Sequence, residues 1–187
     1  MDLYIIYTII IFLAFVQYGQ SCSLGVSPIK YSFARALKIA IVFAIIAWAL
    51  FQLGMIVGVF INVMLGENSF LVSSIILLLV GVKMIIDAKR VKPIDKMFDD
   101  KRWVALVGIA IATAINHLLT GVALGVSDMG LSFELILVLT TATVLLLSLL
   151  GIFLGKKKHF FTSNKINLLI GVFVLLLAGY TLLKLYI

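Results

Sequence analysis

Two long apolar segments of this chain, residues 4–26 and 104–126, carry side chains that could bind an ion or a small polar solute. Positions three or four apart share one face of a helix, so each segment presents a polar stripe. The first stripe consists of Gln17, Gln20 and Ser23, and the second consists of Thr113, Asn116 and Thr120. Polar groups in hydrocarbon are costly without partners, so the stripes predict either hydrogen bonds between helices or a permeation site.

Two further residues lie beside these stripes. His117 is about 100° around the helix from Asn116, so it faces either the same cavity or a neighbouring helix. Cys22 is about 200° from Gln20 and is typical of a small buried hydrophobic residue. It is the single Cys of the chain, which excludes an internal disulfide.

The elements that hold these residues are predicted to be membrane-spanning helices. Of the 187 residues, 64% are hydrophobic and 12% are charged, whereas a soluble domain has roughly 25% charged residues. Apolar runs near the ~20 residues needed to cross a bilayer cover 4–26, 37–64, 70–87, 104–126, 132–154 and 166–186. The sequence therefore predicts an all-α integral membrane protein in which residues 1–187 form a single transmembrane domain of six transmembrane helices.

The basic residues predict the orientation in the membrane. Thirteen of them lie in loops on one side of a six-span topology, and Lys184 is the one base on the other side. The positive-inside rule then places the basic loops in the cytoplasm and both termini outside a cell (plasma) membrane. Topology accounts for the net charge of +7, so no nucleic-acid partner is expected. The loop residues are Lys30, Arg35, Lys38, Lys89, Arg90, Lys92, Lys96, Lys101, Arg102, Lys156, Lys157, Lys158 and Lys165.

Short matches between the two halves predict an internal repeat. The Gly-x-x-x-Gly run 54–58 recurs 97 residues later at 151–155, the run 77–81 recurs 98 residues later at 175–179, and Gly25-Val26 recurs 96 residues later at Gly121-Val122. The offsets predict two three-helix repeats, 1–92 and 103–187, joined by a cytoplasmic connector at 88–102. An odd number of spans in each gives them opposite orientations in the membrane.

The repeat predicts a central site. With the 96-residue offset, Gln20 aligns with Asn116, and their amides are expected to face each other across the bundle centre, with Gln17, Thr113, Thr120 and His117 around them. The competing explanations are chance recurrence of Gly and Leu and simple hydrogen bonding between helices. Small residues four apart predict close helix packing at Gly54, Gly58, Gly121, Gly125, Gly151 and Gly155.

Several stretches resemble the putative manganese efflux pump family of small six-helix bacterial transporters, within the lysine-exporter superfamily. They are Gly81-Val82-Lys83-Met84-Ile85-Ile86-Asp87, Ala110-Ile111-Ala112-Thr113 followed by Gly121-Val122, and Ala14-Phe15. Members of that family place an Asp where this chain has Gln20 and another where it has Asn116. The resemblance therefore implies a divergent member that lacks both intramembrane Asp residues. For Asp87 it implies a site where cations enter from the cytoplasm, and the alternative is a helix-end ion pair with Lys89 and Arg90.

The expected function is a small secondary transporter that works by alternating access between the inverted repeats. Mn²⁺ prefers carboxylate oxygens, so the two amides predict weaker Mn²⁺ binding and an altered substrate, either a divalent metal ion or a small polar solute. The alternative is a transporter-derived membrane protein that no longer transports and instead binds or protects a partner. No enzyme motif and no cofactor are expected. The lipid bilayer is a partner, and a homo-oligomer or protein partner stays open.

Overall fold

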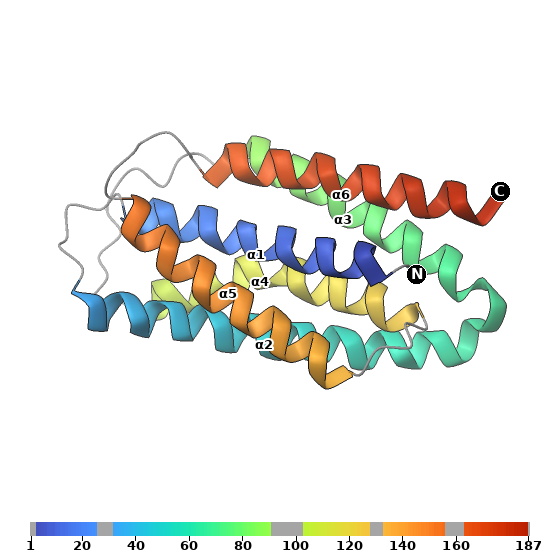
Figure 1. Cartoon of the computed structure of the whole chain (residues 1–187), viewed down its shortest axis with the longest axis horizontal. Coiled ribbons are helices and arrows are strands. Elements are labelled where there is room, and N and C mark those ends of the chain that lie inside the picture. Colours follow the sequence, from blue (N-terminus) through green and yellow to red (C-terminus); the bar gives the residue numbers. More distant parts are fainter. Residues whose placement is uncertain (1–2, 26–31, 91–102, 128–132, 156–162, 187) are drawn as a thin grey trace.

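Figure 1 shows the computed structural model of the chain, an elongated bundle of α-helices. The structure describes residues 3–25, 32–90, 103–127, 133–155 and 163–186, and no β-strand occurs within these ranges. The predicted connector 88–102 is described only as far as Arg90. Most of the basic loop residues also lie outside the described ranges, namely Lys30, Lys92, Lys96, Lys101, Arg102, Lys156, Lys157 and Lys158.

The helices follow the predicted apolar runs closely. The largest difference is at the start of the second helix, which begins at Phe33 because the helix-favouring residues Ala34, Arg35 and Ala36 extend it beyond the apolar run. The preceding Ser32 is extended, with ψ 151°. The helices are α1 (Leu3–Gly25), α2 (Phe33–Leu65), α3 (Ser69–Arg90), α4 (Trp103–Val126), α5 (Phe133–Gly155) and α6 (Ser163–Tyr186), with a short 3₁₀ helix η1 (Gly66–Asn68) between α2 and α3.

These helices have the length and composition of a membrane protein. Five stretches of the described chain are long and apolar enough to cross a bilayer, and one of them, Phe33–Lys89, runs continuously through α2, η1 and α3. At η1 the chain reverses direction, and Gly66 has φ 54° and ψ −123°, a conformation that a residue with a Cβ rarely adopts. The start of α1 and the end of α6 lie at the same end of the bundle as this turn (Figure 1).

The helices pack mainly as three pairs, α2 with α4, α1 with α5 and α3 with α6. Glycines line each pair because a Cβ would meet the neighbouring backbone. A Cβ on Gly54 would collide with the carbonyl oxygen of Leu118 on α4, and a Cβ on Gly151 would stand 2.6 Å from the carbonyl oxygen of Tyr18 on α1. In the same way, Gly58 lies against the Val122 carbonyl and Gly155 against the Cys22 carbonyl. Such approaches allow dispersion contact between backbones.

The third pair is held by glycines that face each other. A Cβ on Gly81 of α3 would stand 3.1 Å from the carbonyl oxygen of Gly171, and a Cβ on Gly171 of α6 would stand 3.1 Å from the carbonyl oxygen of Gly81. At the middle of the bundle, small side chains from four helices form one buried cluster. Its members are Ala14 of α1, Ala44 and Ala47 of α2, Ala114 of α4 and Val144 of α5.

Candidate functional site

A charged side chain connects α3 with α4 inside the bundle. The ammonium Nζ of Lys83 donates a hydrogen bond to Asp87 Oδ2 at 2.7 Å and another to Asn116 Oδ1 at 2.8 Å. Lys83 and Asp87 are four residues apart on α3, a spacing that places them on one face of the helix. Asn116 on α4 is buried. These three residues, called the Lys83 cluster below, form a polar contact in a region otherwise rich in apolar side chains.

The partner of Asp87 differs from the one expected. The sequence offered Lys89 and Arg90 as ion-pair partners; within the described side chains Asp87 pairs with Lys83, one turn earlier on α3, and the side chain of Arg90 is outside what the structure describes. An Asp followed by bases at the end of a helix points its side chain back along the helix, toward the position four residues before it. The sequence contained a signal for this pairing, because Lys83 is a lone cation within an apolar run and stands four residues from an acid.

The two amides of the predicted central site have different surroundings. Asn116 is engaged with α3 through Lys83. Gln20 is buried on α1, and among the hydrogen bonds of the described residues none joins it to Asn116. The side chain of Ser23, the last member of the first stripe, lies outside what the structure describes. Asn116 therefore belongs to a contact between α3 and α4.

The other predicted site residues are deeply buried. Gln17 and His117 have no exposed surface, and Thr113 and Thr120 are also buried. The Thr113 hydroxyl donates to the carbonyl oxygens of Ile109 and Ala110 in its own helix. Neither polar atom of the Gln17 amide and neither ring nitrogen of His117 has a hydrogen-bond partner in the described part of the protein. Buried polar groups are rarely left unpaired, so both side chains retain hydrogen-bonding capacity for water or a ligand.

Two further buried hydroxyls lie on α1 and α5. Ser21 lies one turn along α1 from Gln17, and Ser148 lies on α5, the helix that packs along α1. The hydroxyl oxygens of both are buried and, within the described residues, unpartnered. Ser21 also lies against Gly151 of α5. Ser21 and Ser148 therefore add two side chains whose hydrogen-bonding capacity is unused by the described chain.

The chemistry of the donor set limits which cation could bind. No group of three or more His, Cys, Asp or Glu side chains is found among the residues the structure describes. Asp87 is the one carboxylate of the Lys83 cluster, and its other oxygen ligand is the neutral amide oxygen of Asn116. Hard divalent cations take such oxygens but prefer carboxylates. Cys22 is buried and reduced, on the face of α1 that meets α5.

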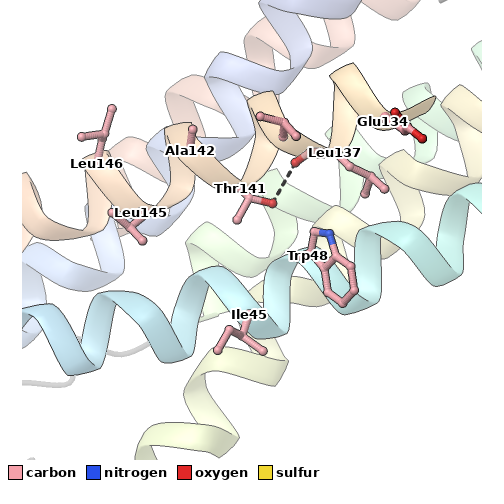
Figure 2. A pocket seen from close by; sticks show the side chains of 9 residues that line it. Ile45, Trp48, Glu134, Leu137, Thr141, Ala142, Leu145 and Leu146 are labelled. Carbon is pink, nitrogen blue, oxygen red and sulfur yellow. Dashed lines mark hydrogen bonds between the residues drawn. The ribbon is translucent and has the colours of Figure 1, made fainter. Parts of the chain in front are cut away.

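An open groove lies away from these polar residues, between α2 and α5 (Figure 2). It has a volume of about 890 Å³, and its lining is almost wholly apolar, with Trp48, Ile45 and Leu146 exposed on its walls. The hydroxyl of Thr141 donates to the Leu137 carbonyl oxygen at 2.8 Å within α5, so it is not offered to a ligand (Figure 2). Glu134 stands at one end. An exposed apolar surface of this kind suits contact with lipid chains.

Comparison with known proteins gives a consistent answer. The sequence profile of a family described as "Putative manganese efflux pump" matches residues 30–183. A protein of Crocosphaera subtropica named "Putative manganese efflux pump MntP" is 28% identical over 172 residues, which cover 92% of this chain and 90% of the relative. The protein of the same name from Rippkaea orientalis is 30% identical over 160 residues, which cover 86% of this chain and 84% of the relative. No solved structure gives a significant match. This chain therefore belongs to the putative manganese efflux pump family.

Proposed function

We propose that this protein is a small secondary transporter that moves a divalent cation of the manganese type across the cell membrane by alternating access between two inverted three-helix units. Family membership over residues 30–183 is the observation that carries this proposal. The relatives are named putative manganese efflux pumps, and the chain has apolar stretches that can cross a bilayer. The basic loops are expected in the cytoplasm and both termini outside.

Matching contacts in the two halves support an inverted repeat of α1–α3 and α4–α6. Gly54 and Gly58 of α2 meet the carbonyls of Leu118 and Val122, as Gly151 and Gly155 of α5 meet those of Tyr18 and Cys22. The equivalent positions are thus 97 residues apart between α2 and α5 and 100 residues apart between α1 and α4. The mutual contact of Gly81 with Gly171 gives 90 residues between α3 and α6.

The apolar core supports the same register. One buried cluster contains Leu24, Ile39, Leu106, Ala110 and Ile152, and a second contains their counterparts Leu124, Ile136, Ile6, Ile10 and Met55. Each pair is separated by 100 residues in α1 and α4 or by 97 residues in α2 and α5. Ala14 and Ala114 in the central cluster are a further pair at 100 residues, and Ala47 and Val144 a further pair at 97. The offset of 100 residues between α1 and α4 thus replaces the predicted 96, and the offset of 90 between α3 and α6 replaces the predicted 98.

The revised register pairs different site residues. Gln17 becomes equivalent to His117, and both are fully buried with unpartnered polar atoms. Each lies three residues beyond an alanine of the central cluster, Ala14 or Ala114, so the two lie on opposite sides of the bundle midpoint. Gln20 becomes equivalent to Thr120. In this proposal the substrate passes the central alanines between Gln17 and His117, with Asn116, Gln20, Thr113 and Thr120 along the route.

Transport is tested in proteoliposomes that contain a manganese-sensitive fluorophore. The wild-type protein should produce Mn²⁺ flux above that of protein-free liposomes, and Asn116→Leu should reduce the rate about tenfold, because an apolar side chain leaves a permeating ion without an oxygen ligand. Thr141→Val is the matched control: it removes a hydroxyl from the outer groove of α5, and its rate should stay within about twofold of wild type since lipid-facing positions tolerate apolar side chains.

The same assay tests the alternative function. A folded wild-type protein with no Mn²⁺ flux above the empty liposomes would contradict the proposal and would favour the non-transporting, partner-binding protein. Folding is verified by circular dichroism and by a single symmetric peak in size-exclusion chromatography, so that an inactive preparation is not mistaken for an inactive protein.

A further inference from the structure

We propose that the ammonium of Lys83 is a built-in competitor for the transported cation: it occupies the oxygen ligands at the contact of α3 with α4, and a divalent ion binds there only after the ammonium has moved away. This inference deepens the proposed function and rests on it in one respect, namely that a cation approaches Asn116. It makes Lys83 a residue that sets the affinity for the cation.

The geometry of Lys83 is that of a bound cation. Its Nζ lies 2.7 Å from Asp87 Oδ2 and 2.8 Å from Asn116 Oδ1, so one carboxylate and one amide oxygen from two helices converge on a single positive centre. An ammonium group donates hydrogen bonds and accepts none, so both oxygens are directed at its charge. These are the types of oxygen that also coordinate hard metal ions.

The charges of the cluster explain why the two cations exclude each other. Lys83 and Asp87 neutralise each other, and Asn116 is uncharged, so the Lys83 cluster has no net charge to offer a divalent ion. A divalent ion at the same oxygens would stand a few ångströms from the ammonium, where repulsion between like charges is strong in a medium of low dielectric constant. When the ammonium leaves, Asp87 becomes a free carboxylate for the ion.

Lys83 has both the room and the reach to leave. About a third of its side chain is exposed, and about two-fifths of that of Asp87. The residue stands seven positions before the end of α3 at Arg90, a distance of roughly 10 Å along the helix axis. A lysine side chain can extend toward the membrane surface from such a depth. The ammonium can therefore exchange between the Asn116 oxygen and the cytoplasmic end of α3, while a cation takes its place.

The test measures Mn²⁺ binding to the purified full-length protein in detergent by electron paramagnetic resonance, which detects free Mn²⁺. Lys83→Met and Lys83→Gln should each tighten Mn²⁺ binding at least about tenfold, because both remove the competing charge and keep an unbranched side chain. Lys83→Arg keeps the charge and should bind as weakly as wild type. Lys165→Met removes an exposed charge of α6 and should change affinity less than about twofold, because such charges are screened.

The outcomes separate this inference from the proposed function. Folded Lys83→Met and Lys83→Gln proteins that bind Mn²⁺ no more tightly than wild type would overturn it, even if the protein transports Mn²⁺. Tighter binding by both variants would support it, even if liposomes show no flux. Adding Asp87→Asn to Lys83→Gln should abolish the gain, and a gain that persists would place the ion elsewhere.

A measurement on the wild-type protein decides the matter if the variants do not fold. Mn²⁺ bound at the Lys83 cluster must release the ammonium, so Mn²⁺ should accelerate labelling of Lys83 by an amine-reactive reagent, read by peptide mass spectrometry. Lys165 serves as the internal control, with an unchanged labelling rate. An unchanged rate at Lys83 at saturating Mn²⁺ would contradict the inference.

Discussion

The contact of α3 with α4 and the contact of α6 with α1 are equivalent in the proposed repeat, but their side chains differ completely. In the first, Lys83 donates to Asn116 across the helices. In the second, the rings of Phe12 and Phe173 stack, with centroids 4.0 Å apart and an angle of 22° between the ring planes. Lys83 and Phe173 are 90 residues apart, the offset that relates α3 to α6. The repeat thus keeps the backbone arrangement and changes the chemistry.

The glycine-lined contacts show the opposite behaviour, since α2–α4 and α1–α5 have matching backbone approaches on both sides. The difference shows what each kind of contact contributes. The close approach of the helix backbones sets how the helices of each unit pack. Two inverted units must pack alike if each is to adopt the conformation of the other during transport. In the proposed alternating access, an ion would interact differently with the polar and the aromatic contact, so the inward-facing and outward-facing states need not have equal free energies even though the helices pack alike.

The largest expected effect comes from filling the glycine contacts on both sides. Gly54→Ala and Gly151→Ala should each lower the free energy of unfolding by about 1–3 kcal/mol, because the added Cβ meets a backbone carbonyl oxygen and forces the helices apart. Thermal unfolding in detergent, followed by circular dichroism, measures the change. Gly108→Ala is the control: nothing lies within 4 Å of its Cβ position, and it should stabilise the helix by about 0.5–1 kcal/mol. Very different losses at Gly54 and Gly151 would count against the matched packing.

A smaller effect is expected from a carboxylate at the polar contact. Asn116→Asp gives the Lys83 cluster a net negative charge and should tighten Mn²⁺ binding about tenfold, equivalent to about 1.4 kcal/mol. Gln20→Asp, on the other half, should tighten it less because no hydrogen bond within the described residues links Gln20 to Asp87. Isothermal titration calorimetry with MnCl₂ compares the two. A larger gain at residue 20 would move the ion site from α3–α4 to α1.

The smallest effect is the coupling energy across each of the two contrasting contacts. A double-mutant cycle with Phe12→Leu and Phe173→Leu should give about 0.5–1.5 kcal/mol for the stacked rings. The corresponding cycle with Lys83→Met and Asn116→Leu should give about 0.6 kcal/mol, typical of a hydrogen bond between membrane helices. Denaturant unfolding at low and high salt measures both. Salt should weaken only the second, because Lys83 is charged and partly exposed; equal sensitivity would show that the contacts are alike.

The sequence predicted the helices well because long apolar runs have few other solutions in a bilayer. The offset of the proposed repeat is harder to predict for a geometric reason. The offsets of 96 and 100 differ by four residues, and 98 and 90 differ by eight, which are close to one and two helical turns. A slip of whole turns leaves the same residues on the same face, so periodicity could not distinguish Gln20 from Val16 as the equivalent of Asn116. Close contacts such as Gly155 with the Cys22 carbonyl carry that information.

The Lys83 cluster was missed for a related reason. The spacing of Lys83 and Asp87 could be read from the sequence, but the bond to Asn116 joins helices whose relative height is set by packing. The buried residues Gln17 and His117 were recognised as polar candidates without any indication that they are equivalent. Ser21 was not singled out, because a lone serine in an apolar helix is common and its meaning depends on its position against Gly151.

The length of α2 has a consequence for the membrane around the protein. Its 33 residues measure roughly 50 Å, whereas the hydrocarbon layer of a bilayer is about 30 Å thick. Phe60, Val63 and Met64 near its C-terminal end are strongly exposed, so that end remains apolar beyond the depth an upright helix would need. We therefore expect α2 to cross obliquely or to thicken the lipid beside it, and the protein to prefer membranes with long acyl chains.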